Sequence, residues 1–274
     1  IKVSRAAQTH AGTYYFADGE GWINASDLST TDNRIEAVQK VLNEKYNNQE
    51  RISVYVKQLD TGKIAAINDE KSMYAASVAK LGVLYYAQER LSHKKLSLSD
   101  EYQYTSAVNG FPGAYDPDGS GKISKMPDDK NYSLENLLKA VAQNSDNVAT
   151  NILGYYVANQ YDHSFQKSVD RASATSWNMD KKELTAKAAG TLMESVYRQN
   201  GDIINYLSST DYDGERISKN IDVPVAHKIG DAYDFKHDVA IVYTDSPFIL
   251  SIFTDKEGYD KITSIADDVY GILR

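Results

Sequence analysis

The sequence predicts an α/β fold of the α+β type, in which an antiparallel sheet flanked by helices accompanies an all-helical lobe. Strand patterns gather near the two ends of the chain, at 52–67 and 223–253, whereas helical patterns dominate from residue 77 to about 208. One helical pattern precedes the first strands, at 34–46, and another follows the last strands, at about 259–273. A sheet assembled from both ends of the chain would bring the start of the helical lobe close to the last strands.

The first 30 residues predict a small β appendage. Two short strands, at 12–16 and 21–28, are joined by a turn at 17–20. The predicted parts of the chain are therefore the appendage at 1–30, an α/β lobe at about 31–76 and 209–274, and a helical lobe at about 77–208. The two lobes together form one domain, residues 31–274.

Each element of this domain follows from a local pattern. Thr31-Asp32 supplies an N-cap for a helix that begins at Arg34. Alternating side chains predict a strand at 52–56, and a turn at 60–63 returns the chain as a second strand, 64–67. The same periodicities predict the remaining elements, which are an apolar helix after Ala75, helices at 134–141, 148–157, 186–198 and about 259–273, and strands at 223–227, 239–243 and 248–253.

Composition excludes several classes of function. The 274 residues include 30 basic and 38 acidic side chains, which gives a formal net charge of −8 without any basic block. Nucleic acid and anionic membranes are therefore not expected partners. The absence of cysteine excludes disulfides, a thiol nucleophile and a cysteine-ligated metal. No apolar run approaches the roughly 18 residues of a membrane span, the N-terminus shows no signal-peptide pattern, and no motif indicates a cofactor.

The string Ser77-x-x-Lys80 predicts a serine nucleophile with a lysine base. Ser77 falls where an apolar helix opens, and a residue three positions later shares its face of that helix. Free N–H groups at a helix N-terminus favour an oxyanion near Ser77, and apolar surroundings should lower the pKa of Lys80. Two other Ser-x-x-Lys strings, beginning at Ser92 and Ser164, lack this context. Taken alone, Ser77 is better explained as a simple N-cap.

Two further strings add to a candidate acyl-transfer site. Ser145-Asp-Asn147 lies on a predicted turn between helices, which can aim the Ser145 hydroxyl and the Asn147 amide into a cleft. Capping of the next helix is the alternative. His227-Lys-Ile-Gly230 ends a predicted strand. There Lys228 would project toward the cleft, and Gly230 would let a substrate backbone lie against the strand edge. By itself, Lys228 would be an ordinary edge-strand lysine.

In this order the three strings resemble the Ser-x-x-Lys, Ser-Asp-Asn and Lys-Thr-Gly signature of serine β-lactamases and penicillin-binding D,D-peptidases. The helical middle and the β–α ends are similar to the class A β-lactamase group over residues 32–274. The resemblance implies a β-lactamase/transpeptidase-like fold and an acyl-enzyme mechanism. The implied substrate is a β-lactam or a peptidoglycan stem peptide.

The resemblance also implies roles for the matched residues. Ser77 attacks a carbonyl and Lys80 is the base that activates it. Ser145 and Lys228 relay a proton to the leaving nitrogen, and Lys228 also helps to bind the substrate carboxylate. The backbone N–H groups of Ser77 and Asp231 are implied to hold the oxyanion. The other implied substrate-binding residues are Asn147 for the substrate's amide side chain, Gly230 at the strand edge, and Lys236 or His237 as a further cation for the substrate carboxylate.

Two departures from the family pattern limit the expected activity. Ile229 replaces the Thr or Ser of the family, which removes a hydrogen bond to the substrate carboxylate typically worth about 1.5–3 kcal/mol. The segment 157–186 looks shortened and lacks the Glu-x-x-Leu-Asn string whose Glu positions the deacylating water in class A enzymes. Glu183 is predicted to open the helix at 186–198, and Asp170 is the only other acid well placed in the segment. Slow hydrolysis of the acyl-enzyme is therefore expected.

The appendage resembles the last hairpin of a GW or bacterial SH3-like wall module, whose strands often end in a Gly-Trp-Ile string like that at Gly21. A hairpin packed on the main domain is the alternative. The resemblance implies that residues 1–30 contact a cell-wall polymer. With the resemblance of the main domain, it predicts an extracellular or cell-surface location on a Gram-positive-like wall.

The loop at 116–123 resembles part of a metal-binding loop. Residues 116–123 imitate the first eight positions of a calcium loop, but Pro127 stands where the bidentate Glu should be. A Gly-Ser-Gly turn between two short strands explains this string without metal.

The predicted function is a serine acyl-enzyme hydrolase or transferase with slow deacylation. Its alternatives are an efficient class A-type β-lactamase, a wall-binding protein with a degenerate catalytic lobe, and a calcium-dependent adhesin.

Overall fold

The computed structural model describes residues 3–28 and 32–274 of the chain. It divides into two compact units, Ile1–Arg34 and Ile35–Arg274, where the sequence predicted a boundary after residue 30. Of the predicted N-cap pair, Thr31 lies outside the described residues. Asp32 Oδ1 accepts a hydrogen bond from the Arg34 backbone N–H at 3.0 Å, so this carboxylate caps the first helix.

The small unit is a three-stranded antiparallel sheet of β1 (Val3–Thr9), β2 (Gly12–Ala17) and β3 (Gly21–Asn24), in that order. The sequence predicted the second and third strands but not β1, whose Arg, Ala and Gln side chains give little β signal. Pairing with β2 along its length supplies the backbone hydrogen bonds instead. The third strand ends at Asn24 rather than residue 28, because the Asn24 side chain caps a 3-10 turn, η1 (Ala25–Asp27).

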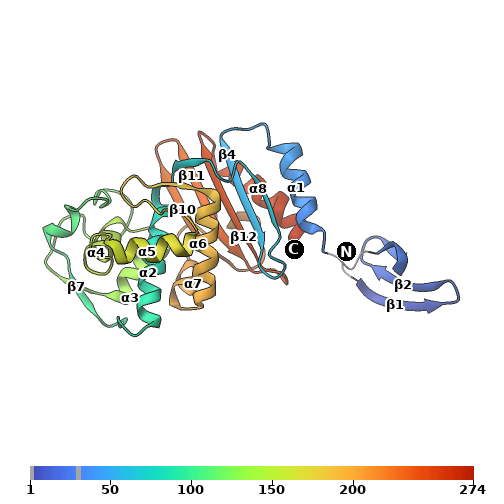
Figure 1. Ribbon diagram of the computed structural model, residues 1–274, viewed down its shortest axis with the longest axis horizontal. Coiled ribbons are helices and arrows are strands. Elements are labelled where there is room, and N and C mark those ends of the chain that lie inside the picture. The colour runs from blue at the N-terminus through green and yellow to red at the C-terminus, as the bar shows by residue number, and fades with distance from the viewer. Residues whose placement is uncertain (1–2, 29–31) are drawn as a thin grey trace. The chain divides into compact units, whose positions relative to one another are not determined.

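The large unit contains the predicted antiparallel sheet, assembled from both ends of the chain (Figure 1). Its strand order is β10-β11-β12-β4-β5, so the C-terminal strands occupy one edge and the N-terminal pair the other. The strands are β4 (Ile52–Gln58), β5 (Ile64–Ile67), β10 (Val225–Ala232), β11 (Phe235–Val242) and β12 (Phe248–Asp255). The predicted strand positions are thereby confirmed. The first of the three C-terminal strands extends to Ala232, so the His227–Gly230 string lies inside β10 rather than at its end.

Both faces of this sheet are covered, and the side chains of its strands divide between two cores. Val54 and Val56 of β4 join a core that includes α1 (Arg34–Lys45) and α8 (Tyr259–Leu273). Tyr55, between them, joins the other core, where its ring lies against Gly190 of α6 (Ala186–Gln199). The strand therefore alternates between two cores. In Figure 1 the helical lobe and the α1–α8 pair lie on opposite sides of the sheet.

The helical lobe begins with η2 (Ala76–Lys80), a 3-10 turn that continues into α2 (Leu81–Ser92). Its other helices are α3 (Leu134–Asn144), α4 (Asn147–Tyr156), α5 (His163–Ser173), α6 and α7 (Asp202–Leu207). Its short elements are η3 (Ser106–Asn109) and the paired strands β7 (Glu101–Gln103) and β8 (Asn131–Ser133). The turn η4 (Ser218–Asn220) belongs to the α/β lobe, where it contacts α8. The sequence did not specify α5, because only Phe165, Val169 and Ala172 form its buried apolar stripe.

Two more elements lie next to Ser77. β6 (Ser72–Tyr74) leads directly into η2 and pairs with β9 (Glu183–Thr185). The prediction that Glu183 opens the following helix is wrong: Glu183 pairs with Tyr74 in the ladder, and Thr185 caps α6 through a bond to Ala188 N. None of the described helices is long and apolar enough to span a membrane.

Candidate active site

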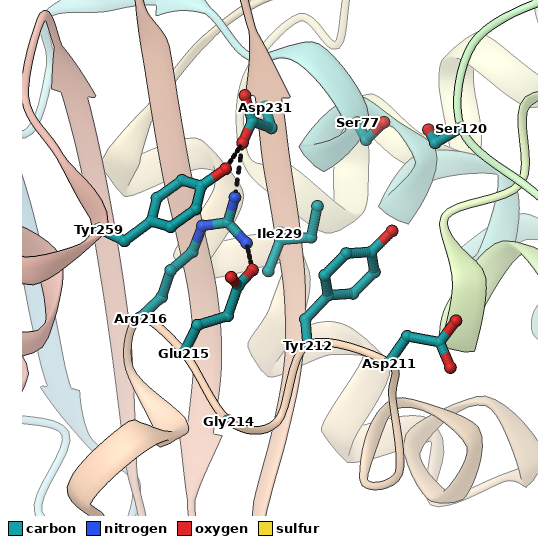
Figure 2. Close-up of a pocket in the computed structure, with 10 residues that line it drawn as sticks. All are labelled: Ser77, Ser120, Asp211, Tyr212, Gly214, Glu215, Arg216, Ile229, Asp231 and Tyr259. Atoms are coloured by element: carbon teal, nitrogen blue, oxygen red, sulfur yellow. Dashed lines mark hydrogen bonds and ion pairs between the residues drawn. The ribbon is translucent and has the colours of Figure 1, made fainter.

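Ser77 lies on the wall of a cavity of about 690 Å³ between the sheet and the helical lobe. It is the second residue of η2 and is 8% exposed. Its hydroxyl has no hydrogen-bond partner among residues 3–28 and 32–274, and Ser77 does not cap the helix. Figure 2 shows the Ser77 side chain facing that of Ser120 across the top of the cavity. The hydroxyl is thus held on a rigid turn and left available to a ligand.

Lys80 is fully buried one helical turn beyond Ser77. Its Nζ donates to the Ser145 carbonyl and to Asn147 Oδ1, both at 2.6 Å, and lies 3.4 Å from Ser145 Oγ. Burial and the neighbouring Lys228 lower the pKa of Lys80 well below the ordinary lysine value, as the sequence predicted. A shift in this direction favours the neutral amine, which is the state that a general base requires.

Ser145 connects the two lysines of the site. It ends α3 in the left-handed conformation, with φ 54° and ψ 37°, so the chain reverses there and α4 starts two residues later. Lys228 Nζ, from β10, donates to Ser145 Oγ at 2.8 Å. Burial lowers the pKa of Lys228 to about 7, so that this amine can give or take a proton near neutral pH. Ser145 and Lys228 can therefore act together as a proton relay.

The other two residues of the Ser145 turn build the cavity wall. Asp146, rather than Ser145, caps α4 by accepting from Ala149 N at 2.8 Å, and its other oxygen accepts from Lys122 N and Ile123 N. Asn147 Nδ2 donates to the Asp116 carbonyl at 2.7 Å, while Oδ1 accepts from Lys80. The side chains of Asp146 and Asn147 thus tie the loop 116–123 to this turn through hydrogen bonds to the loop backbone. In this structure the polar atoms of Asn147 bind the protein, whereas the sequence expected them to meet the substrate.

The same bonds explain the calcium-like string. Asp116 Oδ1 accepts from Asp118 N at 3.0 Å, and no strand flanks the loop 116–123 within the described chain, contrary to the expected turn between two strands. An added Cβ at Gly121, with φ +126°, would lie 2.3 Å from Asp146 Oδ2, so this glycine is needed for the packing. Across the described residues, no group of three or more His, Cys, Asp or Glu side chains is arranged to hold a metal ion.

Gly230 brings β10 against the turn that carries Ser77. A Cβ at this position would lie 2.5 Å from the Ala75 carbonyl oxygen and 3.2 Å from Val78 N. The sequence expected a substrate backbone to lie close to Gly230. In the structure, the backbone of the turn that carries Ser77 lies there instead. This contact places Asp231, the next residue and a cavity-lining one, on the same cavity as Ser77. That juxtaposition is compatible with the expected pair of oxyanion N–H groups.

Of the two residues expected to supply a cation for the substrate carboxylate, His237 is buried and Lys236 is partly exposed. His237 is buried in β11, where Nε2 donates to the Tyr74 carbonyl at 2.9 Å and Nδ1 accepts from Thr254 N at 3.1 Å. Burial lowers the pKa of His237 to about 4, so the imidazole is neutral and structural, and the expected cationic role does not fit it. Lys236 is partly exposed, and its Nζ lies 2.5 Å from Asp231 Oδ1.

Sequence reasoning missed three residues of the site. Arg216 and Tyr259 lie beside Asp231 in the cavity wall (Figure 2), but each stands in a turn-rich or terminal segment without a motif. Lys182 is buried beside the Tyr115 ring: its Nζ lies 4.5 Å from the ring centroid, and Lys80 Nζ lies 4.6 Å from the same centroid. The only sequence signal for Lys182 is its place just before Glu183, at the end of the shortened segment.

Neither acid considered for water activation reaches the cavity lining. Asp170 Oδ1 accepts from Trp177 N at 2.6 Å and from Gln166 Nε2 at 2.5 Å, so it organises the segment after α5. Trp177 fills the space beside α2, where its Nε1 donates to the Ala79 carbonyl at 3.2 Å. Glu183 is exposed at the end of β9. The cavity is lined instead by Asp211, Glu215 and Asp231, each of which is ion-paired.

His227, the residue before Lys228, is buried and contacts two carboxylates. His227 Nδ1 lies 3.0 Å from Asp238 Oδ1, and Nε2 lies 3.2 Å from Asp213 Oδ1 and 3.0 Å from Thr210 Oγ1. Burial disfavours the imidazolium, but the two carboxylates outweigh it and raise the pKa of His227 to about 9. The charged ring thus ties the cavity-lining loop around 210–216 to the strand that carries Lys228.

Comparisons with known proteins agree with this geometry. The model of the Beta-lactamase enzyme family matches residues 33–273. A comparison with curated protein sequences found no match. Among solved structures, the fold is similar to that of PBP-A, with a TM-score of 0.71, 14% identity, and coverage of 88% of this chain and 96% of that one.

Two β-lactamase structures show the same likeness. The enzyme from Sphaerobacter thermophilus has a TM-score of 0.68 at 15% identity, covering 88% of this chain and 95% of that chain. The TLA-1 extended spectrum β-lactamase has a TM-score of 0.68 at 19% identity, covering 87% and 99%. At these identities the structures show the fold alone, while the family model spans nearly the whole large unit. The chain belongs to the Beta-lactamase enzyme family and is a serine hydrolase of the β-lactamase type.

Proposed function

We propose that the chain forms an acyl-enzyme on Ser77 with an amide or ester, such as a β-lactam or a D-Ala-like wall peptide, and releases it slowly. The observation that carries the proposal is the connected set of groups around Ser145: Lys80 on one side and Lys228 on the other, beside a serine with a free hydroxyl. Ser77 Oγ attacks the carbonyl and passes its proton to Lys80, while Ser145 and Lys228 return a proton to the leaving group. The backbone N–H groups of Ser77 and Asp231 stabilise the oxyanion.

Slow release is proposed because, among the residues that the structure describes, each acid lining the Ser77 cavity is ion-paired, and neither Asp170 nor Glu183 lines it. Asp170 accepts hydrogen bonds from Trp177 and Gln166, and Glu183 is an exposed residue of β9. The cavity-lining acids are held in ion pairs, which lowers their ability to take a proton from water. The solved structure of a PBP-A mutant is described as an acyl-enzyme complex with penicillin G, which makes penicillin a reasonable probe for this fold.

Exposure to penicillin is expected to add the mass of one penicillin to the protein and to leave it attached for many minutes. Intact mass spectrometry over time measures both the appearance and the loss of the adduct. Ser77→Ala should remove it, whereas Ser92→Ala, in an exposed Ser-x-x-Lys string of the same chain, should not. Rapid, Ser77-dependent turnover of a chromogenic cephalosporin would contradict slow release and would support an efficient β-lactamase instead. No labelling of Ser77 by penicillin or a fluorophosphonate would support a degenerate catalytic lobe.

We further propose that the small unit binds a cell-wall polymer and that the protein works outside the cell, at the wall. Its sheet has a depression of about 440 Å³ lined by Ala7, Thr9, Tyr14 and Trp22, and the Trp22 side chain is half exposed. Exposed aromatic rings beside hydroxyl groups suit sugar faces. Trp22→Ala is expected to abolish co-sedimentation of the full chain with purified wall fragments, while Met126→Ala, at another exposed apolar side chain, should not. Equal co-sedimentation of the two variants would contradict this proposal.

A further inference from the structure

Lys182 is a buried lysine, 6% exposed, that the proposed reaction does not yet use. Its Nζ donates to the Gly113 carbonyl at 3.1 Å, and its own carbonyl accepts from the Ala75 backbone N–H at 2.7 Å. Burial lowers the pKa of Lys182, and the neighbouring Asp180 opposes that shift. Lys182 is therefore a partly stabilised cation, tied through its backbone to the chain just before Ser77.

The Tyr115 ring brings this cation close to Lys80. The amines of Lys182 and Lys80 lie 4.5 Å and 4.6 Å from the same ring centroid, so the two nitrogens are separated by at most about 9 Å. Asn151 holds the backbone of Tyr115 by accepting from its N–H at 2.7 Å and donating to its carbonyl at 2.8 Å. The Tyr115 hydroxyl donates to the Ala76 carbonyl at 3.2 Å, and burial raises its pKa well above the ordinary value. An uncharged, fixed ring thus holds the two amines beside η2.

The charged groups around Lys80 belong to four segments. Lys182 precedes β9, Lys228 lies on β10, Lys125 lies on the loop that precedes β8, and Asp146 caps α4. Asp146 favours the charged amine, but burial and the three cations outweigh it and lower the pKa of Lys80 well below its ordinary value. The shift is larger for Lys80, which is completely buried, than for Lys182. Lys80 therefore loses its proton while Lys182 still carries its charge.

We infer that Lys182 is a positioning residue for the acylation of Ser77: its charge, held beside the same aromatic ring as Lys80, keeps the Lys80 amine neutral and able to accept the serine proton. This inference rests on the proposed acylation of Ser77. A neutral amine has two N–H groups and one lone pair. The Ser145 carbonyl and Asn147 Oδ1, both 2.6 Å from Lys80 Nζ, accept from the two N–H groups, which leaves the lone pair for the serine proton.

Lys182 exchanges no proton in the reaction itself. Ser77 Oγ forms a bond to the acyl carbon while its proton passes to Lys80, and the bond to the leaving group breaks as Ser145 supplies that group with a proton. The ammonium formed on Lys80 is then repelled by the charge of Lys182, which favours passing the proton onward. The effect of Lys182 on the reaction is therefore electrostatic and acts through Lys80.

The pH dependence of penicillin adduct formation tests the inference. The wild-type rate constant should rise with pH as Lys80 loses its proton. Lys182→Met removes the charge but keeps an apolar stem, so the pKa of Lys80 rises and the rising limb should move to higher pH by about one unit. The maximum rate constant should stay within about threefold of the wild-type value, because the base itself is intact. Lys181→Met, at the exposed preceding residue, should leave the curve unchanged.

A second measurement follows the charge of Lys80 without acylation. NMR titration of lysines labelled with carbon-13 at Cε gives the midpoint for Lys80, whose signal is assigned by its loss in Lys80→Met. Lys182→Met should raise this midpoint by about one pH unit, and Lys182→Arg, which keeps the charge, should return it close to the wild-type value. Lys182→Gln, which keeps a donor for the Gly113 carbonyl, replaces the Met variant if that variant does not fold.

The two measurements separate the possible results. An unchanged midpoint for Lys80, or a loss of rate by the same factor at every pH, would overturn the inference. If the wild-type protein forms no adduct on Ser77 at any pH, the proposed acylation fails, and the role of Lys182 in the reaction fails with it, whatever the NMR titration shows.

Discussion

Replacement of Lys80 by Met is expected to lower the rate constant for acylation of Ser77 by about 10²–10⁴-fold, the usual contribution of a general base. The Lys80 amine is buried, donates to Ser145 and Asn147, and has a pKa held well below that of an ordinary lysine by burial and by Lys228. It is the basic group one turn from Ser77. Without it, the serine hydroxyl has no positioned acceptor for its proton.

The rate of penicillin adduct formation, measured by quenched intact mass spectrometry, tests this expectation. Lys95→Met is the matched control, since Lys95 closes the exposed string that begins at Ser92. Met fills a volume similar to that of the lysine stem, and thermal melting of both variants shows whether the fold persists. If the Lys80→Met variant is acylated within about tenfold of the wild-type rate, the loss is smaller than a general base contributes. That result would assign the base to another group.

Replacement of His227 by Gln is expected to lower the free energy of unfolding by about 3–5 kcal/mol at pH 7, the usual cost of removing one partner of a buried ion pair. The ring is buried between Asp238, itself fully buried, and Asp213. Gln keeps a donor but no charge, so two carboxylates lose their shared cation. Urea unfolding followed by tyrosine and tryptophan fluorescence measures the difference, and His93→Gln, at the exposed end of α2, is the control.

The pH dependence of this effect follows from the direction of the shift. The pKa of His227 is raised from 6.5 to about 9 in the folded chain. Its contribution to the free energy of unfolding is therefore complete below pH 6.5 and is lost as the pH rises through about 9. The wild-type and His227→Gln unfolding curves should converge above that pH. A difference between them that stays constant from pH 6 to pH 10 would show that packing, and not charge, is responsible.

Much of the candidate site could be predicted because its residues stand in short sequence motifs. Ser77 and Lys80 are one turn apart, and the Ser145 turn lies between two helices whose apolar periodicity is plain. The positions of the strands followed from alternation. Two of the missed elements, β1 and α5, have weak local signals. β1 is stabilised by pairing with β2, and α5 by its buried stripe that includes Phe165.

The sequence by itself predicted Ser77 as the nucleophile with Lys80 as its base, and it predicted the order of elements that brings the turn carrying Ser77 against β10. Only the tertiary structure decided the electrostatic state of that cavity. Arg216 and Asp231 form an ion pair between two separate segments, the Tyr259 hydroxyl donates to Asp231 from a third, and His237 is held neutral by burial. The physical reason is that spacing along a helix or strand fixes which side chains share a face, whereas burial and long-range charge pairing exist only after the segments have packed.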